Sequence, residues 1–214
     1  MGDFTITDEL QRAFDAQKID CIQLREATPE EFYSALRDAK MRNEHGAFVT
    51  LHSVDDYRQM AHLLLAVDNT AGVAITKDNN IVSVFNGGEK RGVLKTLLPV
   101  AIENGGRKLD NYGSARLSAM YELYGFNPIS KTPFDRRFAP DDWNYDRDGT
   151  PDVVFWIHNG DSAADVVLNF GTYLVDWKYV KDFRTYDEAE EHRDQIDQEI
   201  ESMEQQVNNP FLSI

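Results

Sequence analysis

A basic, glycine-containing segment near the middle of the chain has the composition of an anion-binding loop. Residues 87–93 read GGEKRGV, and Lys90, Arg91 and Lys95 place three positive charges within six residues. Glycine lets the backbone approach an anion closely, and the unpaired amides at a helix N-terminus carry partial positive charge. The segment therefore predicts a phosphate-binding loop, although a solvated helix start would have a similar composition.

Spacing excludes other chemistries that use similar residues. The loop nearly matches a nucleotide P-loop, but Val93 stands where that motif requires lysine. The segment DRDGTPD at residues 146–152 has glycine at the fourth position of a calcium loop rather than the sixth, and Ile157 replaces the bidentate glutamate. The five histidines have no metal-ligand spacing. We therefore expect no metal site.

The segments around the loop alternate between strand and helix patterns. The β-rich runs 71–76 and 81–85 are separated by the polar turn KDNN, which predicts a hairpin. Apolar residues at helical spacing over 93–102, followed by Asn-Gly-Gly, predict a helix that begins at the loop. A strand over 108–112, a helix that Ser114 caps and Gly125 ends, and strands over 126–131 and 152–157 follow. The continuous apolar run of the last strand indicates a place inside the sheet.

Further elements are predicted on either side of this unit. Residues 21–25 alternate like a strand, and Thr28, Pro29 and Glu31 form a capping box for a helix to about residue 42. A second helix is predicted to begin after Ser53, and its inward positions are Tyr57, Met60, Leu63 and Leu64.

An amphipathic helix with an acidic outer face is predicted over residues 187–207. Its inward positions are Ala189, Arg193, Ile196, Ile200, Met203 and Val207. We expect this helix either to dock on the body of the protein or to pair with a partner, including a second copy of the chain.

The stretch from Ala71 to His158 resembles the GNAT acyl-CoA N-acyltransferases. The resemblance is carried by the loop sequence at residues 87–98 and by AMYELYGF at residues 119–126, which is similar to the family ending L-Y-x-x-x-G-F. It implies an α/β (α+β) fold with a GNAT-like mixed central sheet flanked by helices, and acetyl-CoA as the cosubstrate. The stretch from about residue 22 to 186 is also similar to uncharacterised GNAT-like proteins of phages and prophages.

Three regions follow from this reading. We expect a helical N-terminal extension over residues 1–20, the acyltransferase domain over 21–160, and a C-terminal extension with the acidic helix over 161–214.

The family resemblance also implies roles for individual residues. Tyr121 lies where the family has its general acid, and a phenol with a pKa of about 10 suits protonation of a departing thiolate. Asp110 is the nearest carboxylate for a general base. Tyr121 could instead be a core residue of its helix, and Asp110 a surface residue of its strand. The residues implied in cofactor binding are Val84, Phe85, Asn86, Lys90, Arg91, Gly92, Val93 and Lys95.

Two residues depart from the family loop. Glu89 replaces glutamine or arginine and adds negative charge where phosphates would bind. Leu94 replaces a small residue, and it either narrows the phosphate cradle or turns its side chain into the core. Trp143, Tyr145 and Trp156 could frame a pocket for the acceptor, or they could be buried by ordinary packing.

Charge and hydropathy restrict the partners. The chain has 37 acidic and 22 basic side chains and a net charge of −15, which disfavours nucleic acid and anionic membranes and favours a cationic substrate or partner. No apolar run approaches the roughly 18 residues of a membrane span, and the N-terminus lacks a signal-peptide pattern. We expect a cytoplasmic protein of a bacterial or phage-infected cell. It is either an N-acyltransferase of an unknown amine or an inactive GNAT-fold module that binds a host or virion protein.

Overall fold

The computed structural model of the chain describes residues 4–207. The helices are α1 (Asp8–Ala16), α2 (Pro29–Arg42), α3 (Val54–Gln59), α4 (Leu94–Glu103), α5 (Ala115–Glu122), α6 (Tyr145–Asp148), α7 (Ala163–Leu168) and α8 (Tyr186–Val207). The strands are β1 (Leu24–Glu26), β2 (His62–Ala66), β3 (Ala71–Ile75), β4 (Ile81–Asn86), β5 (Lys108–Tyr112), β6 (Phe126–Thr132), β7 (Val153–His158) and β8 (Lys181–Asp182). Short 3-10 turns lie at Gly46–Phe48, Arg136–Phe138 and Trp177–Tyr179.

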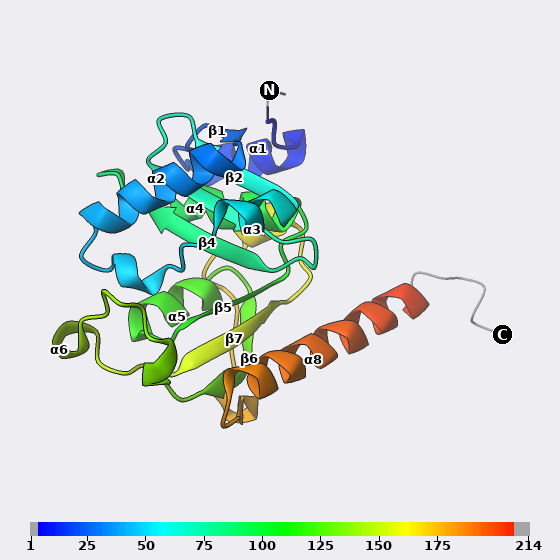
Figure 1. Ribbon diagram of the computed structural model, residues 1–214. Helices are drawn as coiled ribbons and strands as arrows, with labels where there is room; N and C mark the ends of the chain where they lie inside the picture. Colours follow the sequence, from blue (N-terminus) through cyan, green and yellow to red (C-terminus); the bar gives the residue numbers. More distant parts are fainter. Residues whose placement is uncertain (1–3, 208–214) are drawn as a thin grey trace.

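The strands form two four-stranded sheets that meet at one point. Their orders are β1-β2-β3-β4 and β5-β7-β6-β8, so β4 and β5 are the facing edge strands (Figure 1). Asn80 and Lys108 form a parallel bridge where the two strands begin, and the amide of Arg107 donates to the carbonyl of Asn79 at 2.9 Å. Beyond this point β4 and β5 are not paired with each other, and this unpaired stretch between the two edge strands is called the gap below.

Helices cover both faces of the sheets. On one face, α1, α4, α5 and α7 enclose the larger core cluster, which includes Leu64, Val73, Leu97 and Trp156. On the other face, α2 and α3 pack on the first sheet around Phe32 and the 1%-exposed Tyr57. The second sheet carries α8 on that face, where α8 contacts β6 and β7. The mixed α/β architecture with a long C-terminal helix is thereby confirmed.

Local signals in the sequence explain where several helices begin and end. The predicted capping box is present at α2, where Thr28 accepts from the amide of Glu31 and the Glu31 carboxylate accepts from the amide of Thr28. Ser114 caps α5. Gly125, with a φ of +79°, follows α5 in the left-handed conformation that ends helices. The hairpin of β3 and β4 and the strands β5, β6 and β7 are also confirmed.

The predicted helix after Ser53 is too long. Helix α3 ends at Gln59, and Leu63 and Leu64 lie on strand β2 instead of facing inward from a helix. Four of the five residues of β2 are buried, because both faces of the strand are covered. A continuous apolar run fits the spacing of a helix and of a strand equally well. Here the segment forms a strand because it pairs with both β1 and β3.

The C-terminal helix docks on the body along its first part. Ala189 and Arg193 are buried, Ile196 and Ile200 are half-buried, and Met203 is 56% exposed. The later turns project away from the sheets (Figure 1). Residues 208–214 lie outside the described part of the chain.

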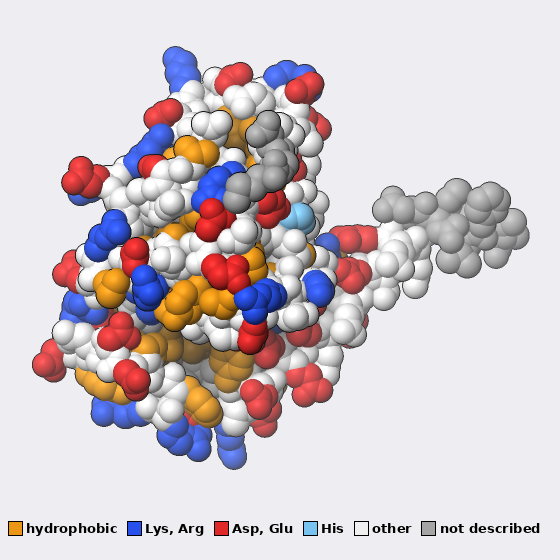
Figure 2. All heavy atoms as spheres, turned by 45° about the horizontal axis from the view of Figure 1, so that its top comes forward, with side chains coloured by type: hydrophobic (Ala, Val, Ile, Leu, Met, Phe, Trp, Pro, Cys, Tyr) orange, Lys and Arg blue, Asp and Glu red, His pale blue; other side chains and the backbone are white. Residues whose placement is uncertain are grey.

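The surface of the molecule is strongly patterned. Figure 2 shows hydrophobic side chains gathered across the middle of one face, with charged side chains on either side of them. No helix within residues 4–207 is long and apolar enough to cross a bilayer.

Candidate active site

A bulge in β4 faces the gap between the sheets. Val82 pairs with Ala74 and Phe85 pairs with Gly72, so Ser83 and Val84 together oppose Val73. Ser83 has a φ of +52°, a left-handed conformation that costs a non-glycine residue on the order of 1 kcal/mol. Bulges of this kind re-aim backbone groups and are frequent beside active sites.

Side-chain hydrogen bonds hold the bulge in place. The hydroxyl groups of Ser83 and Tyr57 lie 2.9 Å apart, and Ser83 Oγ donates to the carbonyl of Thr50 at 3.3 Å. Ser83 is 8% exposed and Tyr57 is 1% exposed, so these bonds satisfy groups that are removed from water.

Strand β4 presents an unpaired edge to the gap. It is the last strand of the first sheet, and beyond Asn80 it has no strand partner on the side of β5. In an antiparallel pair, alternate residues direct their amide and carbonyl groups away from the partner strand. The gap is therefore lined by backbone donors and acceptors that an extended ligand can use.

Val84 and Phe85, near the end of β4, have packed side chains. The side chain of Phe85 is 6% exposed and packs on Phe32, with ring centroids 5.7 Å apart. Val84 is half-buried against the larger core. The side chains of both residues are therefore engaged in packing, which leaves their backbone groups for any ligand along this strand edge.

The loop after β4 has a fixed shape. Asn86 Nδ2 donates to the carbonyl of Lys90 at 2.8 Å, and Asn86 Oδ1 accepts from the amide of Gly88 at 3.1 Å. A Cβ at Gly87 would lie 2.6 Å from the Cβ of Ala39, so only glycine fits there. Gly92 has a φ of +76°.

The loop leads into a helix start with free donors. Val93 precedes α4 and has no side-chain cap bond, and the first loop-to-helix bonds run from Lys95 and from later residues. Within residues 4–207, the amides of Gly92, Val93 and Leu94 have no hydrogen-bond acceptor. This helix start can therefore receive an anion.

The three cations of the loop differ in their availability. Arg91 is exposed and makes no ion pair with any residue that the structure describes. Lys90 pairs with Asp20 at 2.7 Å. Lys95 lies over the ring of Phe170, with Nζ 5.9 Å from the centroid.

The side chain of Leu94 turns toward the core. Leu94 is half-buried and packs against the larger core cluster, so its side chain turns inward and does not narrow the helix start. Glu89 is exposed and leaves a negative charge beside the loop.

Tyr121 is buried in the core with an unpaired hydroxyl. It is 6% exposed, and its ring lies 6.0 Å from both Phe126 and Trp156. The hydroxyl makes no hydrogen bond with any described residue. Burial raises the pKa of Tyr121 well above its ordinary value, and the negative charge of Asp110 raises it further. The phenol is therefore a proton donor rather than an anion at neutral pH.

Asp110 lies on the opposite face of β5 from Tyr121. Its backbone partner on β7 is Phe155, which faces α8, whereas Tyr121 packs on Trp156 from the α5 side. The side chain is half-buried. Burial raises the pKa of Asp110, while the charge of Arg193 and a hydrogen bond from the Tyr186 hydroxyl lower it. The two predicted catalytic residues thus lie on opposite faces of the second sheet.

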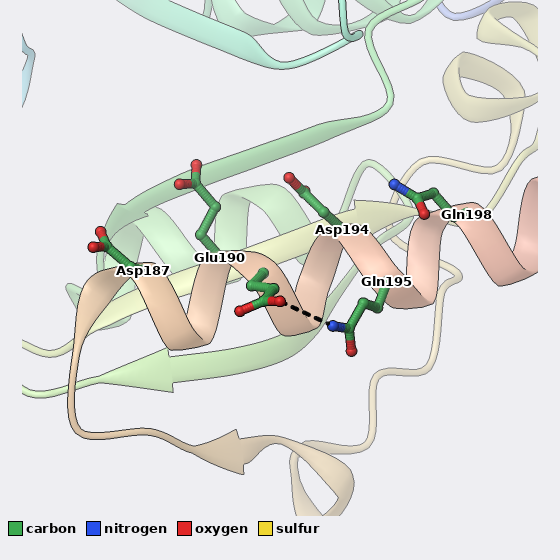
Figure 3. Close-up of a pocket in the computed structure, with 6 residues that line it drawn as sticks. Asp187, Glu190, Asp194, Gln195 and Gln198 are labelled. Carbon is green, nitrogen blue, oxygen red and sulfur yellow. Dashed lines mark hydrogen bonds between the residues drawn. The ribbon is translucent and has the colours of Figure 1, made fainter.

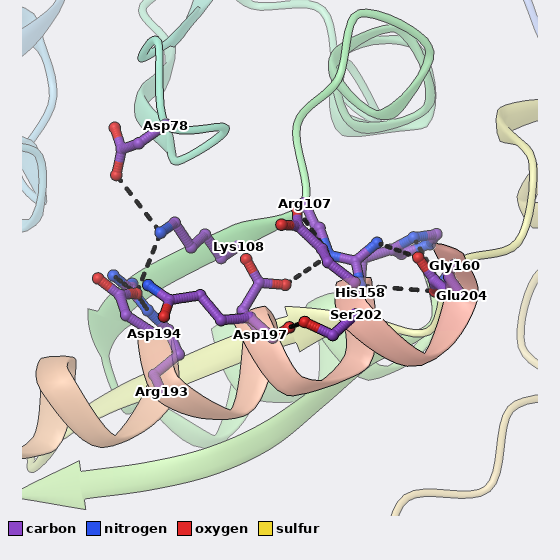
Figure 4. A network of polar contacts seen from close by, with 12 residues as sticks. Asp78, Arg107, Lys108, His158, Gly160, Arg193, Asp194, Asp197, Ser202 and Glu204 are labelled. Carbon is purple, nitrogen blue, oxygen red and sulfur yellow. Dashed lines mark hydrogen bonds and ion pairs between the residues drawn. The ribbon is translucent and has the colours of Figure 1, made fainter. Parts of the chain in front are cut away.

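A polar network fixes α8 beside β5 (Figure 4). Asp194 accepts from Lys108 at 3.1 Å and from Arg193 at 2.9 Å, and Asp78 pairs with Lys108 at 3.4 Å. Arg107 binds Asp197 on the same helix. Arg193 is fully buried, lies 5.5 Å from the ring of Phe155, and leaves its Nη1 without a partner. The helical pattern placed Arg193 on the inner face, but no sequence signal identified its partners.

A shallow pocket runs along the acidic side of α8 (Figure 3). Its lining residues are Asp187, Glu190, Glu191, Asp194, Gln195 and Gln198. Burial raises the pKa of Glu190, and the charge of Asp110 contributes to the same shift, so Glu190 and Asp110 are close. The pocket contains none of the predicted site residues.

Five rings form an aromatic cluster at the end of β5. Tyr112 and Trp143 have ring centroids 4.6 Å apart, Phe48 and Trp143 4.9 Å, and Phe134 and Trp143 5.0 Å. Tyr145 contacts Phe134. Of the three aromatic residues predicted to frame an acceptor pocket, Trp143 and Tyr145 belong to this cluster, whereas Trp156 is fully buried in the core.

The structure does not bring the predicted site residues together in one place. The loop residues surround the start of α4, Tyr121 packs against β6 and β7, and Asp110 lies on the face of β5 that carries α8. No hydrogen bond or ion pair between described residues joins these three places. The bulge at Ser83 had no signal in the sequence, since serine rarely adopts this conformation. Within the described chain, no group of three or more His, Cys, Asp or Glu side chains is placed to hold a metal ion.

Comparison with known proteins gives no family assignment. No protein-family model, no curated protein and no solved structure matches the chain significantly.

Proposed function

We propose that the protein is an acyl-CoA-dependent N-acyltransferase, with acetyl-CoA as the cosubstrate and a primary amine as the acceptor. The observation that supports this function best is the gap between β4 and β5, with the Ser83 bulge on its edge. The order of strand, loop, helix and strand around it is also the order to which the resemblance to GNAT acyltransferases refers.

The cosubstrate is extended, with a phosphate-rich end and a thioester end. In the proposed complex, its phosphates bind the free amides of Gly92, Val93 and Leu94 and the guanidinium of Arg91. The pantetheine arm follows the free edge of β4. A backbone amide near the bulge donates to the thioester oxygen, on which negative charge develops as the amine attacks.

Two side chains transfer the protons of the proposed reaction. Asp110 accepts a proton from the ammonium group of the acceptor, and the neutral amine attacks the thioester carbon. The C–N bond forms and the C–S bond breaks. Tyr121 protonates the thiolate and is reprotonated from the second proton that nitrogen loses, so the products are an amide, free CoA thiol and one released proton.

A second function is favoured by one observation. The acidic side of α8 and its projecting later turns form a charged surface outside the gap. A GNAT-fold module with an idle acyl site could use this surface to bind a basic segment of a host or phage protein. Glu89 in the loop is consistent with weakened phosphate binding.

Turnover separates the two functions. We expect the protein to release CoA thiol from acetyl-CoA in the presence of an amine. Tyr121→Phe should lower kcat about 100-fold with an unchanged dissociation constant for acetyl-CoA, because it removes only the proton donor.

Tyr124→Phe is the matched control. Tyr124 lies three residues further along, is 1% exposed, and has a buried hydroxyl that makes no hydrogen bond with a described residue. If the two variants have equal rates, Tyr121 packs in the core and has no role in proton transfer. Absence of thiol release with every amine tested would contradict the proposed function and favour the binding module.

A further inference from the structure

We propose that Tyr57 is a positioning residue for acyl transfer. Its hydroxyl group holds Ser83 in the left-handed conformation that aims a backbone amide of the β4 bulge at the thioester oxygen. Tyr57 belongs to α3, is 1% exposed, and acts only through Ser83. This inference rests on the proposed acyltransferase function and adds a residue that supports its site from behind β4.

The order of side chains along β4 shows what the bulge changes. Successive residues of a strand normally point to opposite faces. Val82 packs against the smaller core cluster under α2 and α3, and its neighbour Ser83 points to the same side, toward Tyr57. Val84 then faces the larger cluster, and Phe85 faces the smaller one again. The alternation therefore shifts by one residue at Ser83, and the backbone groups that point to the free edge shift with it.

Pairing with β3 fixes the strand on either side of the bulge. Val82 pairs with Ala74, and Phe85 pairs with Gly72. A Cβ at Gly72 would lie 2.7 Å from Cε1 of Phe85, so the ring fits only over a glycine. Because both flanking pairs are set by packing, the backbone direction inside the bulge depends on the conformation of Ser83.

The hydrogen bonds around Ser83 have a defined direction. The Ser83 hydroxyl has a single proton, which it donates to the carbonyl of Thr50 at 3.3 Å. The hydroxyl of Tyr57, 2.9 Å away, is therefore the donor to Ser83 Oγ. Tyr57 accepts in turn from the amide of His52 at 3.4 Å. One chain of hydrogen bonds thus joins the bulge to the loop before α3.

Serine needs this support because a left-handed backbone is unfavourable for a residue that carries a Cβ. Ser83 has a φ of +52°. Ser83 and Tyr57 are both buried, so removal of one hydroxyl leaves the other group with an unsatisfied bond. Backbone conformations of this kind persist only where the surroundings impose them, and they are frequent at active sites.

The position of the bulge affects the rate of the reaction more than the binding of the cosubstrate. A donor to the thioester oxygen acts only at hydrogen-bond distance, and a misplacement of about 1 Å can cost roughly 100-fold in rate. A backbone amide has no rotamer with which to adjust. The phosphates of acetyl-CoA bind elsewhere, at the start of α4, so relaxation of Ser83 should lower kcat and leave the KM for acetyl-CoA nearly unchanged.

Two substitutions at Ser83 separate its hydroxyl from its backbone conformation. Ser83→Ala and Ser83→Gly both remove the hydroxyl, but only glycine adopts a positive φ without a steric cost. We expect Ser83→Ala to lower kcat at least about tenfold, and Ser83→Gly to lower it less than about threefold. Equal kcat values for the two variants would overturn the inference.

A double variant tests whether Tyr57 acts through Ser83. Tyr57→Phe should lower kcat about tenfold, with a KM for acetyl-CoA within about twofold of the parent value. When Ser83→Gly is added, the bulge no longer needs the phenol, and kcat should return to the value of Ser83→Gly alone. A merely structural defect at Tyr57 would not be repaired by a second substitution that introduces a glycine.

Tyr33→Phe is the matched control. Tyr33 is a half-buried residue of α2 that packs against the same cluster, and its hydroxyl makes no hydrogen bond with a described residue, so kcat should not change. Equal kcat values for Tyr57→Phe and Tyr33→Phe, or a double variant that does not recover, would overturn the inference and leave the proposed function standing. Absence of thiol release by the parent protein would contradict the proposed function and this inference together. Urea denaturation of each variant shows whether it is folded under the assay conditions.

Discussion

Burial gives the ionisable side chains of the site unusual protonation states. Tyr121 and Asp110 both have a raised pKa because they are removed from water. The shift makes the Asp110 carboxylate a stronger base, whereas it keeps the Tyr121 phenol protonated and makes it a weaker acid than a free phenol. The burial that causes the shift also makes Tyr121 a core residue.

His158 predicts how stability depends on pH. It is 4% exposed, and burial lowers its pKa to about 4. In the unfolded chain its pKa is about 6.5, so the unfolded state binds more protons between these values. The free energy of unfolding should therefore fall as the pH drops from about 6.5 to about 4, by up to roughly 3 kcal/mol from this residue.

Urea denaturation at a series of pH values checks this contribution. His158→Gln cannot be protonated, so its loss of stability over the same pH range should be clearly smaller. Parallel curves for the parent protein and the variant would contradict the account of His158.

The sequence could identify residues whose role follows from a local pattern. Thr28, Ser114 and Gly125 were predictable because capping and left-handed turns depend on a few neighbouring residues. The left-handed Ser83 was not, because its conformation depends on hydrogen bonds to Tyr57 and Thr50, which are distant in the chain.

Among the elements, α8 depends most on a single residue. The fully buried Arg193 lies among Glu190, Asp194 and the ring of Phe155. Arg193→Ala leaves Glu190 without its cation, removes one of the two cations that bind Asp194, and opens a cavity. We expect a loss of about 3 kcal/mol in the free energy of unfolding, because removal of one partner from a buried ion pair is strongly destabilising.

Two further variants show where this loss comes from. Arg193→Met restores the apolar packing but not the charge, so it should recover only part of the stability. Arg184→Ala, at an exposed residue just before the helix, should change it by less than about 0.5 kcal/mol. Similar denaturation curves for Arg193→Ala and Arg184→Ala would contradict the anchoring role.

Helices and strands were predicted correctly where apolar residues recurred with one clear period, and wrongly where they did not. Helix α4 has a broad apolar stripe and begins at the predicted loop. Strand β2 was assigned to a helix because its continuous apolar run has no period of its own. The loop itself was predictable in composition, but the inward turn of Leu94 depends on packing against the larger core.

At the scale of the whole molecule, two sheets that meet only at Asn80 and Lys108 create the gap. The order of strands and long helices along the chain from β3 to β7 was accessible from the sequence pattern. The division into two sheets was not, because residue periodicity contains no information about which strand edges stay unpaired. Charge is also unevenly distributed, because the basic loop belongs to a chain whose net charge is −15.

Equilibrium binding of acetyl-CoA tests the central claim most directly. In calorimetric titration we expect one molecule to bind per chain, and Arg91→Glu should weaken binding by at least about tenfold by reversing a charge beside the phosphates. Arg37→Glu, an exposed residue of α2, should bind like the parent protein. Absence of binding at millimolar acetyl-CoA, or equal affinity of the two variants, would contradict an acyl-CoA site at this gap.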